Sequence, residues 1–339
     1  MIRIVVDAMG SDNHPHPDVE GAVMAAREYG VEIILVGDEA RIRPVLEAQR
    51  PSNLPIRLVH APDVLTMEDK GEELAFKARH KDAKNSMAVG IDLVKHGQAD
   101  AFVTAGNTGA AMVTALFRLG RIRGVERPAL APIFPTATGS CVVLDVGANP
   151  DCDPLHLLQF AIMGSIYAEK VRGVQRPKVG LISNGEEEGK GNQLVRDATP
   201  LFKASPLLNF YGNVEGKEVI GGKVDVAVTD GFVGNVMLKT AEAVAKLIVD
   251  KIRNAIKAGG LPALIGGLLI KPAMGQVKKL LDPSEHGAAP LLGVNGLVFI
   301  GHGRSDAIAI KNAVRVAKEA VEAKVLDAIK SAIEDSLKK

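Results

Sequence analysis

Residues 293–300, GVNGLVFI, and residues 301–306, GHGRSD, decide the fold class of this 339-residue chain. A short apolar run bounded by glycines is typical of a buried strand. A helical pattern follows, from Ala307 towards Lys330. The sequence therefore predicts a strand, a tight turn and a helix, and such turns are where open α/β sheets bind ligands.

The 301–306 turn is well suited to an anion. Gly301 and Gly303 let backbone N–H groups approach a ligand closely, and a helix N-terminus adds unpaired donors with partial positive charge. Arg304 offers a planar fork of donors that matches phosphate, while His302 and Ser305 add one donor each. The alternative is a plain tight turn in which Ser305 or Asp306 caps the helix. The turn alone leaves both interpretations open.

Short apolar runs alternate with helical patterns along the whole chain. The predicted strands are residues 2–6, 33–36, 101–104, 142–146, 179–182, 224–229 and 297–300. The predicted helices are residues 18–29, 87–96, 108–119, 156–171 and 233–257. Continuous apolar runs are typical of parallel strands buried on both faces. We therefore predict an α/β fold, a three-layer α/β/α arrangement with a mostly parallel, doubly wound sheet.

Bulk composition excludes several classes of protein. The formal net charge of +1 and the absence of tryptophan argue against a nucleic-acid binder. The only cysteines, Cys141 and Cys152, allow neither a disulfide framework nor a zinc site, which fits a reducing cytoplasm. The chain opens directly on a strand without a signal peptide, and no apolar run approaches the roughly 20 residues that span a bilayer.

Polar residues cluster where the predicted strands end. The clusters include Asp7 and Gly10, Asn107 with Thr108 and Gly109, Asn184 and Lys190, Asp230 and Asn235, and Arg304. Carboxyl ends of parallel strands share one edge of a sheet, so we expect these clusters to form the rim of an active site.

Several of these residues have a simpler structural explanation. Asn107 or Thr108 could merely cap a helix. Asn235 and Lys239 are four residues apart and therefore share a helix face. That face could be partly exposed to solvent or directed at the site. In the second case, Asp230 could orient Asn235 or Lys239. Asp145, Asp151 and Asp153 could ligate a metal, but turn and capping chemistry explains them better, so we expect no metal and no cofactor.

Seven blocks along the chain carry a family resemblance. They are DAMGSD at 7–12, TAGNTGA at 104–110, LDVGANP at 144–150, ISNGEEEGKGN at 182–192, TDGFVGNVMLKT at 229–240, SEHGAAPLLG at 284–293 and the 301–306 turn. Together they closely resemble the PlsX family, the bacterial acyl-[acyl carrier protein]:phosphate acyltransferases of phospholipid synthesis. The resemblance extends to about Ile310. It departs at Ser11, where a second glycine is usual, and at HGAA, residues 286–289, where Tyr-Gly-Gly-Ala is usual.

The resemblance implies a fold related to phosphotransacetylases and to isocitrate and isopropylmalate dehydrogenases, a homodimer, and a reaction. No protein nucleophile is evident: Cys141 lies in a core strand and no Gly-x-Ser-x-Gly elbow occurs. This suits the reaction that the resemblance implies, in which inorganic phosphate attacks the thioester of a long-chain acyl-acyl carrier protein. By analogy with phosphotransacetylases, Arg304 would hold phosphate and Ser305 or His302 would donate to the carbonyl oxygen.

The predicted site residues fall into two groups. The predicted catalytic residues are His302, Arg304, Ser305, Asn235 and Lys239. The predicted phosphate- and substrate-binding residues are Asp7, Gly10, Asn107, Thr108, Gly109, Asn184, Lys190, Asp230, Gly301 and Gly303. Rival activities are a phosphotransacetylase acting on acyl-coenzyme A, a metal- and NAD-dependent dehydrogenase, and a non-catalytic carrier-binding scaffold. No Gly-x-Gly-x-x-Gly turn supports the dehydrogenase.

Two surface features suggest partners. One basic cluster holds Lys77, His80, Lys81 and Lys84, and a second holds Arg118, Arg121, Arg123 and Arg127. Either could dock an acidic carrier protein, although a solvated face explains each cluster too. The apolar segment 259–271 is flanked by Lys257, Lys271, Lys278 and Lys279, which is typical of an interfacial anchor. The expected membrane-facing residues are Leu261, Leu264, Ile265, Leu268 and Leu269.

The alternative for this segment is a buried hairpin at a dimer interface. A length prior favours about two domains, but no linker marks a boundary. We therefore expect one catalytic domain over residues 1–339 with an apolar protrusion near 257–281. The resemblance also implies peripheral association with the inner face of the cell membrane and hand-over of the product to a membrane glycerol-3-phosphate acyltransferase.

Overall fold

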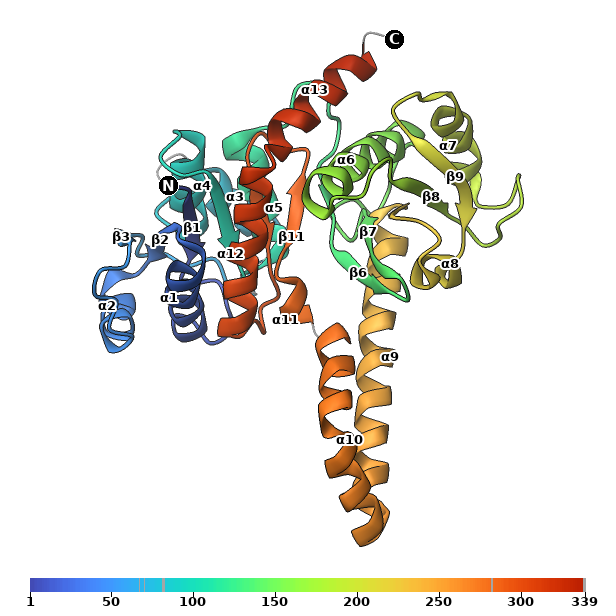
Figure 1. Cartoon of the computed structure of the whole chain (residues 1–339). Helices are drawn as coiled ribbons and strands as arrows, with labels where there is room; N and C mark the ends of the chain where they lie inside the picture. Colours follow the sequence, from blue (N-terminus) through green and yellow to red (C-terminus); the bar gives the residue numbers. More distant parts are fainter. Residues whose placement is uncertain (67, 70, 81–82, 282, 338–339) are drawn as a thin grey trace.

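The computed structural model describes residues 1–66, 68–69, 71–80, 83–281 and 283–337. Seven strands form the first sheet: β1 (Arg3–Asp7), β2 (Glu32–Gly37), β3 (Ile56–His60), β4 (Ala101–Thr104), β5 (Ala129–Leu130), β11 (Ala289–Leu292) and β12 (Val298–Ile300). Five form the second: β6 (Ile133–Thr136), β7 (Gly139–Leu144), β8 (Lys178–Ile182), β9 (Asn209–Val214) and β10 (Val226–Val228). The α/β prediction is confirmed, and the strands are divided between two sheets (Figure 1).

Both sheets are mostly parallel. The first has the order β3-β2-β1-β4-β12-β11-β5. At one end, β11 pairs in antiparallel fashion with both β12 and β5, and the other pairs are parallel. The second has the order β6-β7-β10-β8-β9, with β6 antiparallel at its edge. In each sheet, therefore, the carboxyl ends of the parallel strands share one edge.

Helices cover both faces of the first sheet and complete the three layers. One face carries α1 (His16–Tyr29) and α12 (Ala307–Glu322), and the other carries α4 (Ser86–Lys95) and α5 (Thr108–Leu119). The second sheet packs against α6 (Pro154–Arg172) and α7 (Gln193–Ala204) on one face and α8 (Gly216–Gly221) on the other. A single cluster of buried side chains, which includes Val6, Leu144, Phe160 and Val314, runs through both lobes.

The two ends of the chain build the same lobe. The elements from β1 to β5 and from β11 to α12 surround the first sheet, so segments from both ends of the chain lie side by side in Figure 1. Residues 325–337 pack against α6 of the second lobe. Residues 133–228 form the second sheet and its helices. The remaining short helices are α2 (Glu39–Ala48), α3 (Gly71–Arg79) and α11 (Pro283–His286).

Two predicted helical stretches end earlier than expected. The stretch towards Lys330 breaks between α12 and α13 (Val325–Leu337), because Lys324 adopts a left-handed φ of 51° that ends a helix. The basic cluster at residues 77–84 loses its common face, because α3 ends at Arg79 and leaves Lys84 outside the helix. Lys81 lies outside the described residues.

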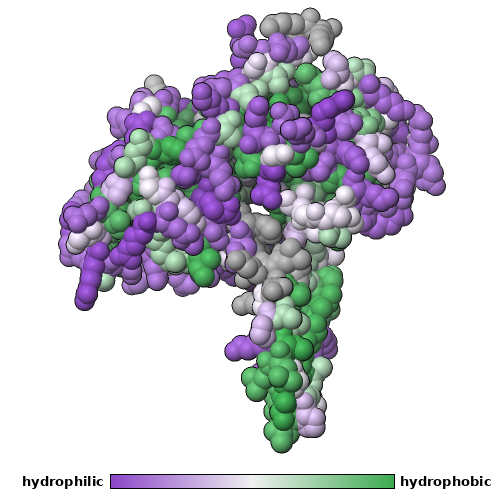
Figure 2. Space-filling model, in the orientation of Figure 1, coloured by the Kyte–Doolittle hydropathy of each residue, from purple (hydrophilic) through white to green (hydrophobic). Residues whose placement is uncertain are grey.

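A long helical hairpin projects from the two lobes (Figure 1). It consists of α9 (Gly231–Ala258) and α10 (Gly260–Leu281), joined where Gly260 takes a φ of 68°. A Cβ added at Gly267 would lie 2.6 Å from Ile256, so the two helices approach closely. In Figure 2, the face of the hairpin that is in view is mostly apolar towards its tip. Its expected membrane-facing side chains are 43–77% exposed: Leu261, Leu264, Ile265, Leu268 and Leu269.

Among the described residues, no helix combines the length and the apolar character needed to cross a bilayer.

Candidate functional site

Three loops meet at the point where the strand order of the first sheet reverses. The chain runs outward from β1 to β2 and β3, and then returns to place β4 on the other side of β1. Open α/β sheets bind ligands at such a point. The N–H of Gly301 donates to the carbonyl of Thr104 at 2.7 Å, and the N–H of Asp12 donates to the carbonyl of Gly303 at 2.7 Å. The loops after β1, β4 and β12 are thus joined into one surface.

Helix α9 connects the second sheet to this surface. It begins directly after β10. The side chain of Lys239 on this helix reaches the 301–306 turn, and its Nζ lies 3.1 Å from Nε2 of His302. Glu242, one helical turn further, places Oε2 3.1 Å from Nζ of Lys239 and Oε1 3.8 Å from Nε2 of His302. Two of the predicted catalytic side chains are therefore in contact, with a carboxylate beside them.

Burial and Lys239 together favour the neutral form of His302. Burial and the ammonium group of Lys239 lower the pKa of His302 below its usual value near 6.5, and the carboxylate of Glu242 opposes them. A protonated lysine only donates hydrogen bonds, so Nε2 of His302 accepts and Nδ1 carries the proton. His302 therefore offers one N–H donor at neutral pH.

Arg304 is exposed and uncommitted. Within residues 1–66, 68–69, 71–80, 83–281 and 283–337, its guanidinium makes no hydrogen bond and no ion pair. Asp306 caps α12, because its Oδ1 accepts from the N–H of Ala309 at 2.9 Å. The hydroxyl of Ser305 donates to the carbonyl of His302 at 2.6 Å. The helix is therefore capped without Arg304, which leaves its fork of donors for a ligand.

Two predicted binding residues, Asp7 and Gly10, lie beneath the surface and support it. Asp7 is 1% exposed and accepts from Thr104 Oγ1 at 2.7 Å and from the N–H of Met9 at 3.1 Å, while burial raises its pKa. A Cβ at Gly10 would lie 2.8 Å from Thr104 Oγ1, so only glycine permits this close approach of two loops. The structure places both residues under the site.

Asn107 has its amide group fully engaged. Its Oδ1 accepts from the N–H of Ala110 at 3.1 Å, and its Nδ2 donates to the carbonyls of Thr66 at 3.1 Å and Asp69 at 3.3 Å. It therefore caps α5 and holds the backbone of Thr66 and Asp69 beside it. Thr108, the first residue of α5, is exposed, and Gly109 is half-buried next to it. Direct contact of these two with a ligand stays a prediction.

The start of α9 is packed against the loop after β7. Asp230 caps the helix by accepting from the N–H of Val233 at 2.8 Å. A Cβ added at Gly147 would lie 3.7 Å from Cβ of Asn235, which places this side chain over the 145–150 loop. The carboxylate of Asp145 is buried and accepts from Leu130 at 2.9 Å and Asn149 at 2.6 Å. Backbone donors thus occupy the carboxylate that suggested a metal ligand.

Asn184 and Lys190 lie at the edge of the other sheet. Oδ1 of Asn184 accepts from the N–H of Gly191 at 2.9 Å, and Nδ2 of Asn213 donates to the carbonyl of Lys190 at 3.4 Å. Both side chains are exposed. In the described part of the chain, no hydrogen bond or ion pair joins this loop to the 301–306 turn. The sequence led us to expect all the polar clusters at one sheet edge. They lie instead at the edges of two sheets, and α9 connects these two edges.

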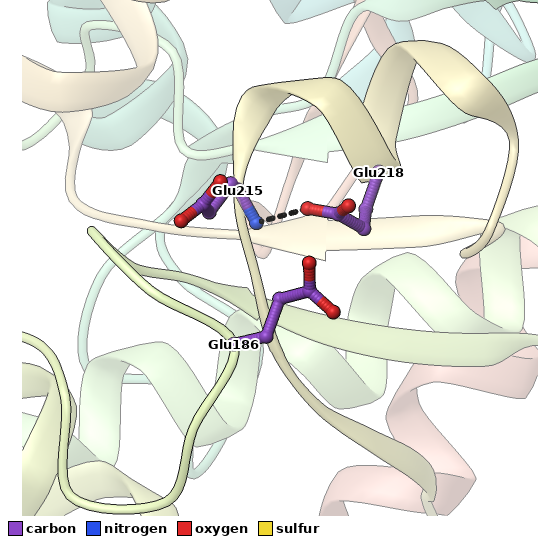
Figure 3. Close-up of side chains that lie close together, drawn as sticks. All are labelled: Glu186, Glu215 and Glu218. Carbon is purple, nitrogen blue, oxygen red and sulfur yellow. Dashed lines mark hydrogen bonds between the residues drawn. The ribbon is translucent and has the colours of Figure 1, made fainter.

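Three glutamates form an acidic cluster near that loop (Figure 3). Carboxylate oxygens of Glu186, Glu215 and Glu218 lie within 4.8 Å of one another. Lys217 places Nζ 3.1 Å from Glu186, 2.9 Å from Glu215 and 3.7 Å from Glu218. Glu218 also accepts from the N–H of Glu215 at 3.0 Å. An internal ammonium group therefore supplies the positive charge, and we propose no metal site here.

Sequence reasoning missed two residues of the site. Glu242 follows Lys239 by three residues, a spacing that places two side chains on one helix face, so it could have been identified. Asp12 contributes a backbone N–H, which no residue type signals in a sequence.

The fold is similar to that of phosphotransacetylases, which are α/β/α proteins. The EutD phosphotransacetylase from Staphylococcus aureus is similar over 94% of both chains, with a TM-score of 0.59 and 17% identity. A phosphotransacetylase from Streptococcus pyogenes covers 95% of this chain and 94% of its own, with a TM-score of 0.58 and 18% identity. The predicted kinship of the fold is confirmed.

Sequence comparison identifies the family. The model described as "Fatty acid synthesis protein" matches residues 2–328. The phosphate acyltransferase of Pelotomaculum thermopropionicum is 48% identical and covers 98% of this chain and 95% of its own. The phosphate acyltransferase of Desulforamulus reducens is 49% identical, and the match covers 99% of this chain and 98% of that protein. The chain belongs to the phosphate acyltransferase (PlsX) family and is an acyltransferase of lipid biosynthesis.

Proposed function

We propose that the protein transfers a long-chain acyl group from acyl carrier protein to inorganic phosphate, which yields acyl-phosphate and holo-acyl carrier protein for phospholipid synthesis. The observation that carries this proposal is the uncommitted guanidinium of Arg304 on the same turn as the neutral His302, with Lys239 beside them. This group of donors suits a phosphate and a thioester carbonyl together.

The reaction needs no covalent intermediate on the protein. A phosphate oxygen attacks the thioester carbon, so a carbon–oxygen bond forms and the carbonyl oxygen becomes negatively charged. The tetrahedral intermediate then collapses, the carbon–sulfur bond breaks, and the carrier leaves as a thiolate that takes up a proton. Arg304 and the turn amides hold phosphate, and His302 Nδ1–H stabilises the oxyanion, or the Ser305 hydroxyl does so once it turns away from the carbonyl of His302. Lys239 adds positive charge where two anions meet.

The identity of the acyl donor is tested by direct competition. Purified protein receives palmitoyl-acyl carrier protein or palmitoyl-coenzyme A at equal concentrations, with phosphate present. The proposal predicts a kcat/KM for the carrier thioester that is at least tenfold higher. Equal use of both thioesters would favour a phosphotransacetylase, whose fold this chain shares.

The exposed hairpin supports a second part of the proposal, peripheral association with the inner face of the cell membrane. Leu261, Leu268 and Leu269 are 71%, 70% and 77% exposed, and such side chains are seldom left in water as a group. Lys257 and Lys271 flank them and suit anionic lipid headgroups. We expect the product to be released close to the membrane, where a glycerol-3-phosphate acyltransferase would take it.

A homodimer is the third part of the proposal. Val244, Leu247 and Ile248 of α9 are 47–56% exposed on the half of the hairpin nearer the lobes. A second copy would cover this face while leaving the tip free for lipid. Sedimentation equilibrium, with Leu247→Glu as the disrupting variant, would show whether the face joins two chains.

A further inference from the structure

A buried carboxylate lies behind the 301–306 turn, and among the described residues one side chain donates a hydrogen bond to it. Asp18 is fully buried, and its Oδ2 accepts from the hydroxyl of Ser11 at 2.5 Å. Its Oδ1 has no hydrogen-bond partner among the residues that the structure describes. Burying a carboxylate with so few partners is costly, so the contact it does make calls for an explanation.

The Ser11–Asp18 bond joins the loop after β1 to the helix that follows it. Ser11 directly precedes Asp12, whose N–H donates to the carbonyl of Gly303 at 2.7 Å. Asp18 lies in the first turn of α1. The carbonyl of Ser11 is also held, since Nδ1 of His14 lies 2.6 Å from it. The loop is therefore fixed on both sides of the amide that contacts the 301–306 turn.

Helix α1 in turn supports the start of α12. A Cβ added at Gly21 would lie 2.5 Å from the carbonyl of Ala307 and 2.6 Å from Cβ of Ile310, so the two helices touch directly behind the turn. Contacts thus run in a closed ring from Asp18 to Ser11, through Asp12 to Gly303, along the turn to α12, and back through α1 to Asp18.

We propose that Ser11 and Asp18 are positioning residues that set the affinity of the 301–306 turn for phosphate. The inference rests on the proposed function, because it assumes that this turn holds phosphate. Without the Ser11 hydroxyl, the Asp12 amide loses its anchor and the Gly303 carbonyl, next to Arg304, is no longer held in one place.

The test measures binding of inorganic phosphate by isothermal titration calorimetry, without any acyl donor. Ser11→Ala removes the donor and should weaken phosphate binding about three- to tenfold, the effect of one lost hydrogen bond. Asp18→Asn keeps an acceptor for Ser11 and should bind phosphate within about twofold of the wild type. Ser165→Ala removes a buried hydroxyl that has no partner in α6, and serves as the matched control.

The outcomes separate positioning from mere stability. A Ser11→Ala variant with a lower melting temperature and unchanged phosphate affinity overturns the inference. Weaker binding in Ser165→Ala as well would show a general effect of buried hydroxyl loss and also overturn it. Wild-type protein that binds no phosphate overturns both this inference and the proposed site. Normal phosphate binding with acyl release that needs no phosphate overturns the proposed function alone.

Discussion

At the scale of single residues, the pKa of His302 is set by burial and by two neighbours of opposite charge. Lys239 lowers the pKa of this histidine and Glu242 raises it. Lys239→Met should therefore raise the pKa of His302, and Glu242→Gln should lower it further. Because a histidine with a raised pKa protonates at higher pH, the acidic limb of kcat/KM should move up in the first variant and down in the second.

The check is a proton NMR titration of the imidazole, assigned with His302→Asn, together with the pH–rate profiles. Shifts of the same sign in both variants would show that the pair does not act through charge. An acidic limb that neither variant moves would remove His302 from the rate-determining chemistry.

Arg304 should control phosphate and leave the acyl donor almost untouched. Arg304→Lys keeps the charge but loses the planar fork. Loss of one charge-assisted contact is worth about 1.5–3 kcal/mol, which lowers kcat/KM for phosphate roughly 10- to 100-fold. Steady-state kinetics with each substrate varied in turn provides the measurement. A folded variant with wild-type phosphate kinetics would place the phosphate elsewhere.

Asp18 should make stability fall as pH rises. Burial raises its pKa from 3.8 to about 7. Between these values the unfolded chain has released the proton and the folded chain retains it, so folding is progressively disfavoured up to about pH 7 and level above it. The free energy of unfolding should fall by a total on the order of 4 kcal/mol over this range. Asp18→Asn has no carboxyl group to titrate, so its stability should lack this pH dependence.

Urea denaturation of both proteins at several pH values tests that prediction. The stability of Asp18→Asn relative to wild type should increase between pH 4 and pH 7. A constant difference across that range would mean that Asp18 is already ionised in the folded state at acid pH.

At the scale of elements, periodicity predicted the central parallel strands and the helices α1, α4, α5, α6 and α9. It missed several helix breaks and five strands, which are β3, β5, β6, β9 and β11. β4 and α5 begin and end where the apolar patterns do, at Ala101–Thr104 and Thr108–Leu119. The break after α12 was missed because Lys324 is not a residue type that signals a left-handed turn. The protruding hairpin starts well before residue 257, because the projecting half of α9 has a helical pattern like that of a packed helix.

The hairpin prediction belongs to this scale. Leu264 and Leu268 lie one turn apart on α10 and are 43% and 70% exposed. Each should contribute on the order of 1.5–3 kcal/mol when buried in a lipid interface. Leu264→Glu with Leu268→Glu should therefore release the protein from anionic vesicles in a co-sedimentation assay, while turnover of soluble carrier substrate persists.

The matched control carries the same charge change away from the hairpin. Leu201 and Leu207 are 37% and 38% exposed on the second lobe, and replacing both with glutamate should leave vesicle binding intact. Aggregation and loss of the dimer in the hairpin variant would indicate that the segment is an interface between chains. Unchanged vesicle binding by a folded, dimeric hairpin variant would contradict the anchor.

At the scale of the whole molecule, the division into two lobes could not be predicted from the sequence, because one lobe is built from two separate parts of the chain. The first sheet takes β1 to β5 from one end of the chain and β11 and β12 from the other, so no linker marks a boundary. The same arrangement explains why the clusters form two rims. Seven strands were located to within about three residues at each end, but strand order across two sheets is a long-range property that local patterns do not encode.

The candidate site was predictable to a similar extent. The 301–306 turn and the contact of Lys239 with His302 agree with a helix face directed at the site. The engagement of Asp7 and Asn107 could not be predicted, because their partners are Thr104 and backbone carbonyls of distant loops. Residue type shows which groups can bind phosphate, whereas packing decides which of them remain free to do so.

The most direct test of the central claim is a phosphate-dependence assay. Purified protein is mixed with palmitoyl-acyl carrier protein, with and without inorganic phosphate, and released holo-carrier is measured while hydroxylamine traps any activated acyl product. The account predicts holo-carrier release only with phosphate, and an equal amount of acyl hydroxamate. Equal release in phosphate-free buffer would identify a thioesterase and contradict it.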